Sequence, residues 1–149
     1  MTEPNHQAAI AEHIRQDRFT AFLGVDIEAI EPGYSRVSLT VTEAMHNFHG
    51  MTHGGVIFSL GDIAFAAASN SHGQTAVALN VSISFLKATK AGDQLVAEAK
   101  EQHLGGRTAL YEITVTERQT GQLVAKSQAM VYRKREWFAA TGAEENNTS

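Results

Sequence analysis

The chain has 149 residues, of which 43% are hydrophobic and 19% are charged, an ordinary composition for one globular domain. Its net charge of −4 argues against non-specific binding of nucleic acid, and the absence of cysteine excludes disulfides and thiolate chemistry. The polar N-terminal segment does not resemble a signal peptide and no apolar run is long enough to cross a bilayer, so we expect a cytoplasmic protein without nucleic-acid or membrane partners.

The first half of the chain predicts one short helix and two strands. Residues from Asn5 to Asp17 carry apolar side chains at helical spacing, which favours a short N-terminal helix. Residues 22–35 predict a strand and then a turn at Pro32-Gly33. From Arg36 to Thr42 apolar and polar residues alternate, which is typical of a strand with one buried face.

The centre of the chain predicts a buried helix, and the rest predicts strands. The stretch from Val56 to Ala68 is apolar nearly all round, and a helix of that kind is buried rather than laid on a surface. Alternation then resumes, with the odd-numbered residues from Val77 to Phe85 expected on one face. The later strands are predicted at Leu95–Ala99, Ala109–Val115 and Leu123–Val131.

Long strands joined by short loops favour a mainly antiparallel sheet with one buried face. The economical arrangement is an α+β fold, in which one curved antiparallel sheet wraps around a long buried helix and a short N-terminal helix packs beside it. We expect a single domain from residue 1 to residue 138. The composition of residues 139–149 predicts a disordered tail.

Asp62 stands out because it lies in the middle of the apolar helix. A carboxylate there must find a partner, belong to a site, or cost several kcal/mol of desolvation. No Lys or Arg lies within one helical turn of it. We therefore interpret Asp62 as a candidate site residue, and the alternative is a buried carboxylate whose hydrogen bonds hold the helix in place.

The sequence His53-Gly54-Gly55 stands where the helix must begin. Glycine lets the backbone approach a ligand closely, and the first turn of a helix offers unpaired N–H donors with a partial positive charge. Together these features suit an oxygen atom that becomes negative. The alternative, a glycine pair that only makes a tight entry turn, is equally compatible with the residues.

The spacing between the two features predicts an association of two chains. Asp62 follows Gly54 by eight residues, which places them about 12 Å apart along one helix. A nucleophile or base and an oxyanion donor must both lie about 3 Å from one reacting group. Two antiparallel copies of the helix satisfy this condition, so we expect a dimer with two shared sites.

The segment NFHGMTHGGVIFSLGDIAFAAASN, from Asn47 to Asn70, resembles the signature of PaaI-type hotdog-fold acyl-CoA thioesterases, a family named for phenylacetic acid degradation. The segments FLGVDI, SISFLKATKAGD and GRTALYEITV extend the likeness over most of the chain. The resemblance implies a hotdog fold and hydrolysis of acyl-CoA thioesters, with aryl or arylacetyl-CoA as the substrate. It implies no cofactor, since coenzyme A is part of the substrate, and a homodimer that often pairs again into a homotetramer.

The resemblance also implies a role for each residue of the signature. Asp62 matches the catalytic carboxylate, acting as general base or nucleophile, and the N–H of Gly54, or of Gly55 beside it, matches the oxyanion donor. Asn47 matches the asparagine that positions the carbonyl or the water, and His53 matches the histidine that organises the turn. Some relatives carry a water-holding serine on the strand after the helix. That neighbourhood here has Ala78, with Asn80 as a candidate substitute.

Substrate-binding residues are predicted in two groups. Candidates for the wall of an acyl pocket are Phe48, Met51, Leu60 and Phe65. Candidate cations for the phosphates of coenzyme A are Lys87, Lys90, Arg107, Arg133 and Lys134, because phosphates bind Lys and Arg strongly. A solvated charged rim is the alternative for any single cation, and a medium-chain fatty acyl group remains an alternative to an aryl group.

Other classes of site and function fit the residues less well. His46, His49 and His53 have a spacing close to that of metal ligands, but no fourth ligand is evident, so we expect no metal. Ser59 lies inside the helix without a G-x-S-x-G elbow, so a Ser-His-Asp site is disfavoured. Its hydroxyl is expected to bond to the backbone four residues earlier.

Two further functions of the same fold remain open. A non-catalytic acyl-CoA-binding hotdog protein would not need Asp62. A hotdog dehydratase or hydratase would need an acid–base pair that the chain does not evidently supply.

Overall fold

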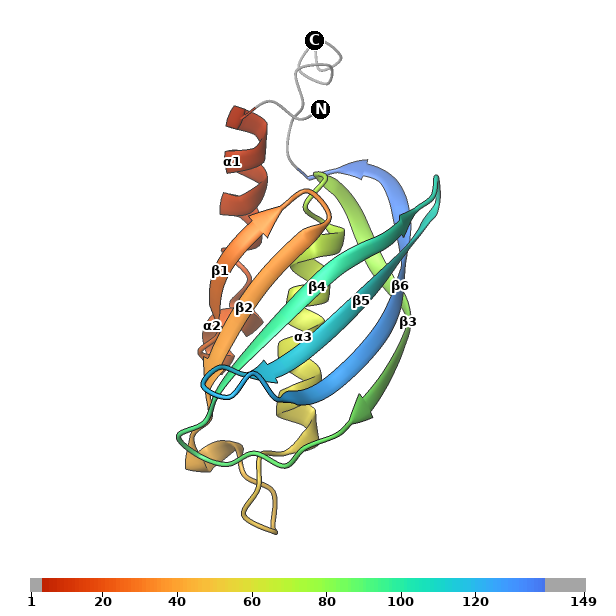
Figure 1. Cartoon of the computed structure of the whole chain (residues 1–149). Coiled ribbons are helices and arrows are strands. Elements are labelled where there is room, and N and C mark those ends of the chain that lie inside the picture. Colours follow the sequence, from red (N-terminus) through yellow and green to blue (C-terminus); the bar gives the residue numbers. More distant parts are fainter. Residues whose placement is uncertain (1–3, 139–149) are drawn as a thin grey trace.

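The computed structural model describes residues 4–138, and the predicted disordered tail from 139 to 149 lies outside the described residues. One curved antiparallel sheet wraps around a central helix (Figure 1). The elements in chain order are α1 (Pro4–Ile14), α2 (Arg18–Leu23), β1 (Asp26–Glu31), β2 (Tyr34–Thr40), the 3₁₀ turn η1 (Glu43–Met45), α3 (Gly54–Ser69), β3 (Gln74–Phe85), β4 (Gln94–Leu104), β5 (Thr108–Glu117) and β6 (Leu123–Trp137). None of the helices between residues 4 and 138 has the length and apolar character needed to cross a membrane.

The order of the strands leaves β3 at an edge of the sheet. The order is β1-β2-β4-β5-β6-β3, and every pair of neighbours is antiparallel. The chain therefore passes from β2 through α3 to the opposite edge of the sheet before it builds the middle. β1 and β3 each have one side that no strand among residues 4–138 covers.

The core lies between the concave face of the sheet and one side of α3. Leu60 and Phe65 of α3 are buried there, and the ring of Phe65 packs edge-on against Tyr111 of β5 at 5.7 Å between centroids. Burying a side chain of this size contributes about 1.5–3 kcal/mol. Gly61 faces β5, and a Cβ added at this position would lie at an ordinary contact distance of 3.5 Å from Cγ2 of Ile113.

Part of the other side of α3 is not covered by residues 4–138. Gly55, Phe58, Asp62 and Ala66 are exposed and recur at intervals of three and four residues, which places them on one stripe of the helix. The prediction of a helix buried on all sides is therefore wrong for the single chain. One sheet has only one concave face, and a second surface must come from elsewhere to cover the stripe.

A bulge in β3 changes which residues share a face. The pairing with β6 shifts register between Ala78 and Asn80, and an inserted residue reverses the alternation beyond it. Val81 and Ile83 pack against the core, whereas Val77 and Leu79 are 40% and 56% exposed. The predicted single face from Val77 to Phe85 is wrong at its first part for this reason.

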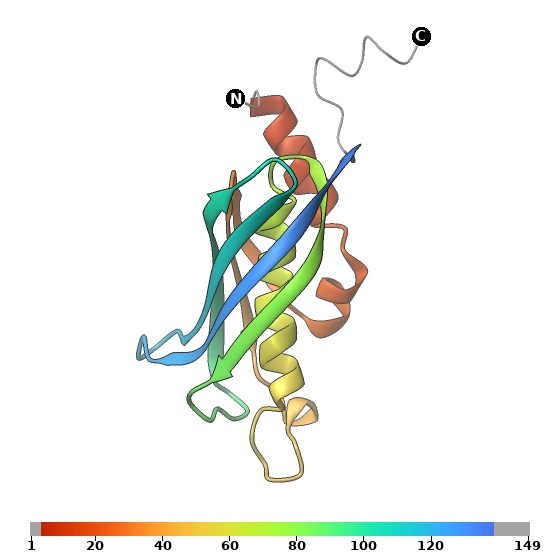
Figure 2. The ribbon, with the colours of Figure 1, turned by 90° about the vertical axis from the view of Figure 1, so that its right-hand side faces the viewer.

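The N-terminal segment forms two helices where one was predicted. α2 has only six residues, but both of its ends carry local signals: the Asp17 carboxylate accepts a hydrogen bond from the N–H of Thr20 at 3.0 Å, and Gly24 ends the helix with φ of 78°. Such an N-cap and a glycine with positive φ are typical of helix ends. Figure 2 shows α1 and α2 beside α3, away from the middle of the sheet.

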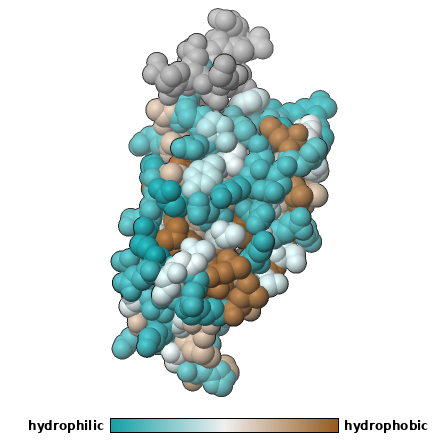
Figure 3. Space-filling model, viewed as in Figure 1, coloured by the Kyte–Doolittle hydropathy of each residue, from teal (hydrophilic) through white to brown (hydrophobic). Residues whose placement is uncertain are grey.

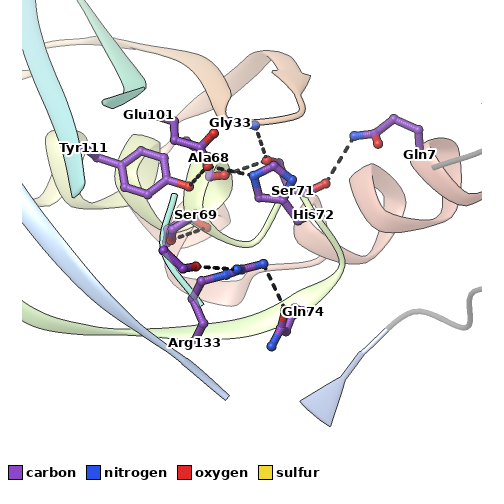
Figure 4. Close-up of polar contacts among 12 residues, drawn as sticks. Gln7, Gly33, Ala68, Ser69, Ser71, His72, Gln74, Glu101, Tyr111 and Arg133 are labelled. Carbon is purple, nitrogen blue, oxygen red and sulfur yellow. Dashed lines mark hydrogen bonds and ion pairs between the residues drawn. The ribbon is translucent and has the colours of Figure 1, made fainter. Parts of the chain in front are cut away.

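A polar network holds the C-terminal end of α3 against the sheet (Figure 4). The Ser71 hydroxyl donates to the carbonyl of Ala68 at 2.6 Å and accepts from the N–H of Gly33 at 2.7 Å. Glu101 of β4 accepts from the Tyr111 hydroxyl at 3.0 Å and lies 2.8 Å from Nε2 of His72. Burial, together with the charge of Glu101, raises the pKa of Tyr111, so its hydroxyl stays a donor. These contacts set the position of α3, and with it the position of Asp62.

Candidate active site

The cap at the start of α3 distinguishes the two glycines that begin it. His53 is the N-cap residue, and its Nδ1 accepts a hydrogen bond from the N–H of Gly55 at 2.8 Å. The N–H of Gly54 has no hydrogen-bond partner within residues 4–138. His53 therefore organises the turn, as the resemblance implies, and Gly54 is the glycine whose donor remains available to an oxygen atom of a ligand.

The loop before α3 is shaped by Asn47. Its Oδ1 accepts from the N–H of His49 at 2.9 Å and from the N–H of Met51 at 3.2 Å. Gly50 completes the turn with φ of 75°. The amide NH₂ of Asn47 makes no hydrogen bond with the described residues, so the loop holds Asn47 in place through its oxygen and leaves its donors free. Phe48 is at the tip and is 92% exposed.

The same loop is anchored to the connection between β3 and β4. The N–H of Thr52 donates to the carbonyl of Thr89 at 2.9 Å, and their hydroxyls lie 2.7 Å apart. His46 Nε2 accepts from the N–H of Ala91 at 2.8 Å. Of the three histidines whose spacing resembles that of metal ligands, His46 and His53 each accept a hydrogen bond from a backbone N–H through a ring nitrogen. Between residues 4 and 138 no three His, Asp or Glu side chains gather as metal ligands.

Asp62 projects from the exposed stripe of α3, two turns after the start of the helix. Its carboxylate makes no hydrogen bond and no ion pair with any residue between 4 and 138. The partial burial of its surroundings and the negative charge of Asp17 both raise the pKa of Asp62. A carboxylate without structural partners and with a raised pKa is a candidate general base or nucleophile.

Asp62 borders a cleft between α3 and the two N-terminal helices. The cleft has a volume of about 740 Å³, within the usual range of small-molecule sites. Its apolar surface comes from Ile14, Phe19, Ile27, Ile63, Ala66, Ala67 and Phe138, and its polar groups include His13, Asp17, Arg18 and Asn70. This arrangement suits an apolar group that enters beside the carboxylate.

Sequence reasoning missed the contribution of the N-terminal segment to this cleft. Asp17, Phe19 and Thr20 approach α3 because α2 turns back toward it. The signals were present in the segment DRFTAFLG, with Asp17 as a cap and Gly24 as a stop. A helix of six residues is too short to show a clear hydrophobic period, which is why no element was predicted over residues 18–21 and residues 22 and 23 were assigned to the following strand.

Ser59 has the structural role that was expected for it. Its hydroxyl donates to the carbonyl of Gly55, four residues earlier, at 2.7 Å. The Nδ1 of His53 is bound to the N–H of Gly55 and not to Ser59. Ser59, His53 and Asp62 therefore form no chain of hydrogen bonds of the kind that a serine nucleophile requires.

The predicted pocket residues are divided between the core and the surface. Leu60 and Phe65 are buried in the core of the single chain, while Phe48 and Met51 lie on the exposed loop before α3. Asn80 pairs with Met130 across the sheet, so both side chains lie on the convex face, away from α3. Ala78 brings no hydroxyl group to the site.

The predicted cations lie at opposite ends of the molecule. Lys87 and Lys90 follow β3, near the start of α3, whereas Arg107 is in the turn between β4 and β5 at the far end (Figure 1). Lys87 donates to the Glu117 carboxylate at 2.6 Å, and Lys90 is exposed. Within one chain, Lys90 is the cation near the start of α3 that has no ion-pair partner among residues 4–138.

Comparisons with known proteins identify the family to which the chain belongs. The sequence profile of the thioesterase superfamily matches residues 49–124. A putative esterase of Archaeoglobus fulgidus is 42% identical over 127 residues, which are 85% of this chain and 82% of that protein. The acyl-coenzyme A thioesterase PaaI of Escherichia coli is 45% identical over 97 residues, which are 65% of this chain and 69% of that protein. The chain belongs to the thioesterase superfamily.

Solved structures agree with this assignment. The structure of E. coli PaaI, from the phenylacetic acid degradation operon, matches with a TM-score of 0.85 and 35% identity over 92% of this chain and 99% of that chain. A Streptococcus mutans protein bound to acetyl CoA matches with a TM-score of 0.71 and 35% identity over 74% of this chain and 88% of that chain. The predicted hotdog fold, the PaaI-type resemblance and the predicted class of enzyme, a thioester hydrolase, are confirmed.

Proposed function

We propose that the protein hydrolyses acyl-CoA thioesters to a free acid and coenzyme A. The observation that carries the proposal is the pair of unused groups on α3: the carboxylate of Asp62 and the N–H of Gly54 at the start of the helix. The similarity to an acyl-coenzyme A thioesterase and to a protein bound to acetyl CoA supports coenzyme A as the carrier of the acyl group.

Each unused group has a place in the reaction. Hydrolysis adds an oxygen to the thioester carbonyl carbon, the C–S bond breaks, and the sulfur of coenzyme A leaves and takes up a proton. Asp62 either takes the proton of the attacking water, or attacks the carbonyl carbon itself to form a mixed anhydride that water then hydrolyses to the free acid and Asp62. The N–H of Gly54 donates to the carbonyl oxygen as it becomes negative. The free amide NH₂ of Asn47 is a second donor that orients the carbonyl.

These groups act on one thioester only if two chains meet. Gly54 and Asp62 belong to one continuous helix and are about 12 Å apart along its axis. An antiparallel second copy of α3 would bring its own Gly54 beside Asp62 of the first chain. The exposed stripe of α3 and the uncovered edge strand β3 are the surfaces that this homodimer would bury, and further pairing into a tetramer is implied by the resemblance.

The apolar lining of the cleft beside Asp62 suits an apolar acyl group, and the resemblance implies an aryl or arylacetyl group. The volume of the cleft, about 740 Å³, exceeds that of one aromatic ring. A medium-chain fatty acyl group is therefore the alternative substrate to compare with an aryl group. Phe48 and Met51 lie on the loop next to the start of α3 and would contact the substrate there. Lys90, the cation near the start of α3 without an ion-pair partner among residues 4–138, is proposed to bind the phosphates of coenzyme A.

Replacement of Asp62 by Asn tests the proposal. Asp62→Asn should lower kcat for acyl-CoA hydrolysis by about 10²-fold or more, since loss of a general base has an effect of this order. In the wild type the pKa of Asp62 is higher in the folded state than in the unfolded state. Above the folded-state pKa the charged carboxylate therefore destabilises the fold, and this destabilisation disappears as the pH falls through that pKa. The melting temperature of Asp62→Asn at neutral pH should therefore be unchanged or higher.

The assay should compare phenylacetyl-CoA, benzoyl-CoA and octanoyl-CoA, with free thiol release as the measured quantity. A wild-type protein that binds these thioesters without hydrolysing them would support the acyl-CoA-binding alternative instead. Full turnover in a folded Asp62→Asn protein would reject the catalytic role of Asp62.

A further inference from the structure

A second, much smaller hollow adjoins Asp62 on the side of α3 that faces the sheet. Phe58, Gly61, Asp62 and Phe65 border it from the helix, and their spacing of three and four residues places them on one face. Val81, Ile83, Ile113 and Ser127 border it from β3, β5 and β6. The hollow has a volume of about 10 Å³, close to the lower limit for one water molecule.

Ser127 is the unusual member of this lining. It lies on the concave face of β6, opposite Ile83 of β3 and Ile113 of β5, and is only 7% exposed. Its hydroxyl oxygen is buried and has no hydrogen-bond partner among the described residues. Apart from Asp62, every other side chain that borders the hollow is apolar.

A buried hydroxyl without a partner is costly for folding. The strand does not require it, because Ala125 and Ala129 occupy neighbouring inward positions of β6 with small apolar side chains. The hydroxyl of Ser127 and the carboxylate of Asp62 border the same hollow, whose size suits one water molecule. The hollow therefore places the proposed general base, Asp62, beside Ser127, whose hydroxyl makes no hydrogen bond within residues 4–138.

We propose that Ser127 is a positioning residue that holds the water molecule from which Asp62, as general base, removes a proton. This inference rests on the proposed thioester hydrolysis and adds to it the group that binds the nucleophile. The water contacts Ser127 Oγ and the Asp62 carboxylate, its proton passes to Asp62, and its oxygen bonds to the thioester carbonyl carbon. The C–S bond then breaks, and the coenzyme A sulfur takes up a proton. Ser127 itself forms no covalent bond.

The first test is Ser127→Ala. It should lower kcat for hydrolysis by about tenfold or more while KM stays unchanged, because the hydroxyl contacts the water and not the thioester. The melting temperature should be unchanged or higher, since the substitution removes an unpaired buried group. A structural serine would show the opposite pattern, with a lower melting temperature and an unaltered kcat, and that result would overturn the proposal.

A matched pair separates the hydroxyl from its volume. Ser127→Thr and Ser127→Val add the same extra bulk to the hollow, but only Thr keeps a hydroxyl. Both variants carry the same packing strain, so Thr should retain a higher kcat than Val. Equal kcat values in the two variants would contradict the proposal.

A competing nucleophile supplies a readout that packing does not alter. Hydroxylamine brings its own nucleophilic nitrogen and yields a hydroxamate, so Ser127→Ala should raise the ratio of hydroxamate to acid relative to the wild type. An unchanged ratio would count against a water-binding role. A wild-type protein without thioesterase activity would reject the proposed function as well, whereas an active wild type with an equally active Ser127→Ala would reject only the role of Ser127.

Discussion

His53 determines which backbone donor is available at the start of α3. Its Nδ1 accepts a hydrogen bond from the N–H of Gly55, so of the two proposed oxyanion donors only the N–H of Gly54 has no partner among residues 4–138. The geometry of His53, with φ of −61° and ψ of 137°, is the extended conformation that a residue before proline prefers. Gly54 is the first residue of the helix, where proline is well tolerated.

Gly54→Pro therefore removes one N–H with little change of fold. We expect it to lower kcat/KM by about 10²-fold, the effect of losing one oxyanion donor, with a melting temperature close to that of the wild type. Gly54→Ala is the matched control: it keeps the N–H, and its Cβ would meet Phe85 at an ordinary 3.5 Å. An active Gly54→Pro enzyme would place the oxyanion donor elsewhere.

At the scale of elements, α2 brings a second carboxylate to the cleft that Asp62 borders. Asp17 caps α2 and accepts hydrogen bonds from the N–H and the hydroxyl of Thr20, so it is held in place. Its charge adds to the effect of burial on the pKa of Asp62. His13 of α1 and Arg18 of α2 face the same cleft. The N-terminal helices thus influence the site through charge as well as shape.

Asp17→Asn should shift the acidic limb of the kcat/KM profile to lower pH. The active form of Asp62 is the carboxylate, a nearby negative charge disfavours that form, and its removal lowers the pKa of Asp62. Asparagine caps helices about as well as aspartate, so the fold is retained. Asp17→Ala should shift the limb in the same direction but also destabilise the protein by about 1 kcal/mol, the usual effect of a lost cap. A limb that stays in place or moves to higher pH would disprove the coupling.

At the scale of the molecule, two surfaces of the chain remain uncovered beside each other. The stripe of α3 with Phe58 and Asp62 is exposed, and β3 presents an edge that no strand among residues 4–138 pairs with, with exposed Leu79 and Phe85. Unpaired edges of this kind are usually paired or protected. Figure 3 shows the face seen in Figure 1, which is mainly hydrophilic with an apolar area in its lower half, toward the end where α3 begins. A second copy of the chain would cover both the stripe and the edge.

Mixing two inactive variants tests whether the site is shared. Asp62→Ala lacks the carboxylate and Gly54→Pro lacks the donor, so each homodimer should be inactive. A mixed dimer contains one site with both groups intact, and equal mixing with random exchange should restore about one site in four, as two-fold symmetry requires. The measurement is activity after subunit exchange, with exchange verified by tagged subunits. If exchange is complete and no activity returns, the two groups act within one chain.

The residues determine the local features of this protein by themselves. Alternating residues in 36–42 and in the later strands predicted the sheet, and the apolar run from Val56 to Ala68 predicted the central helix. The rise per residue of a helix is constant, so the sequence alone predicts the separation of Gly54 and Asp62 and the need for a second chain. These features depend on neighbours within a few residues.

The tertiary structure decided what depends on contacts between distant segments. The side chain of His53 bound the N–H of Gly55 and left the N–H of Gly54 without a partner among residues 4–138. The core took up Leu60 and Phe65, and the bulge in β3 moved Val77 and Leu79 off the predicted face. The approach of α2 to α3 placed Asp17 near Asp62, and the packing of β6 under α3 left Ser127 unpaired. None of these outcomes follows from spacing, because each is the result of packing one element against another.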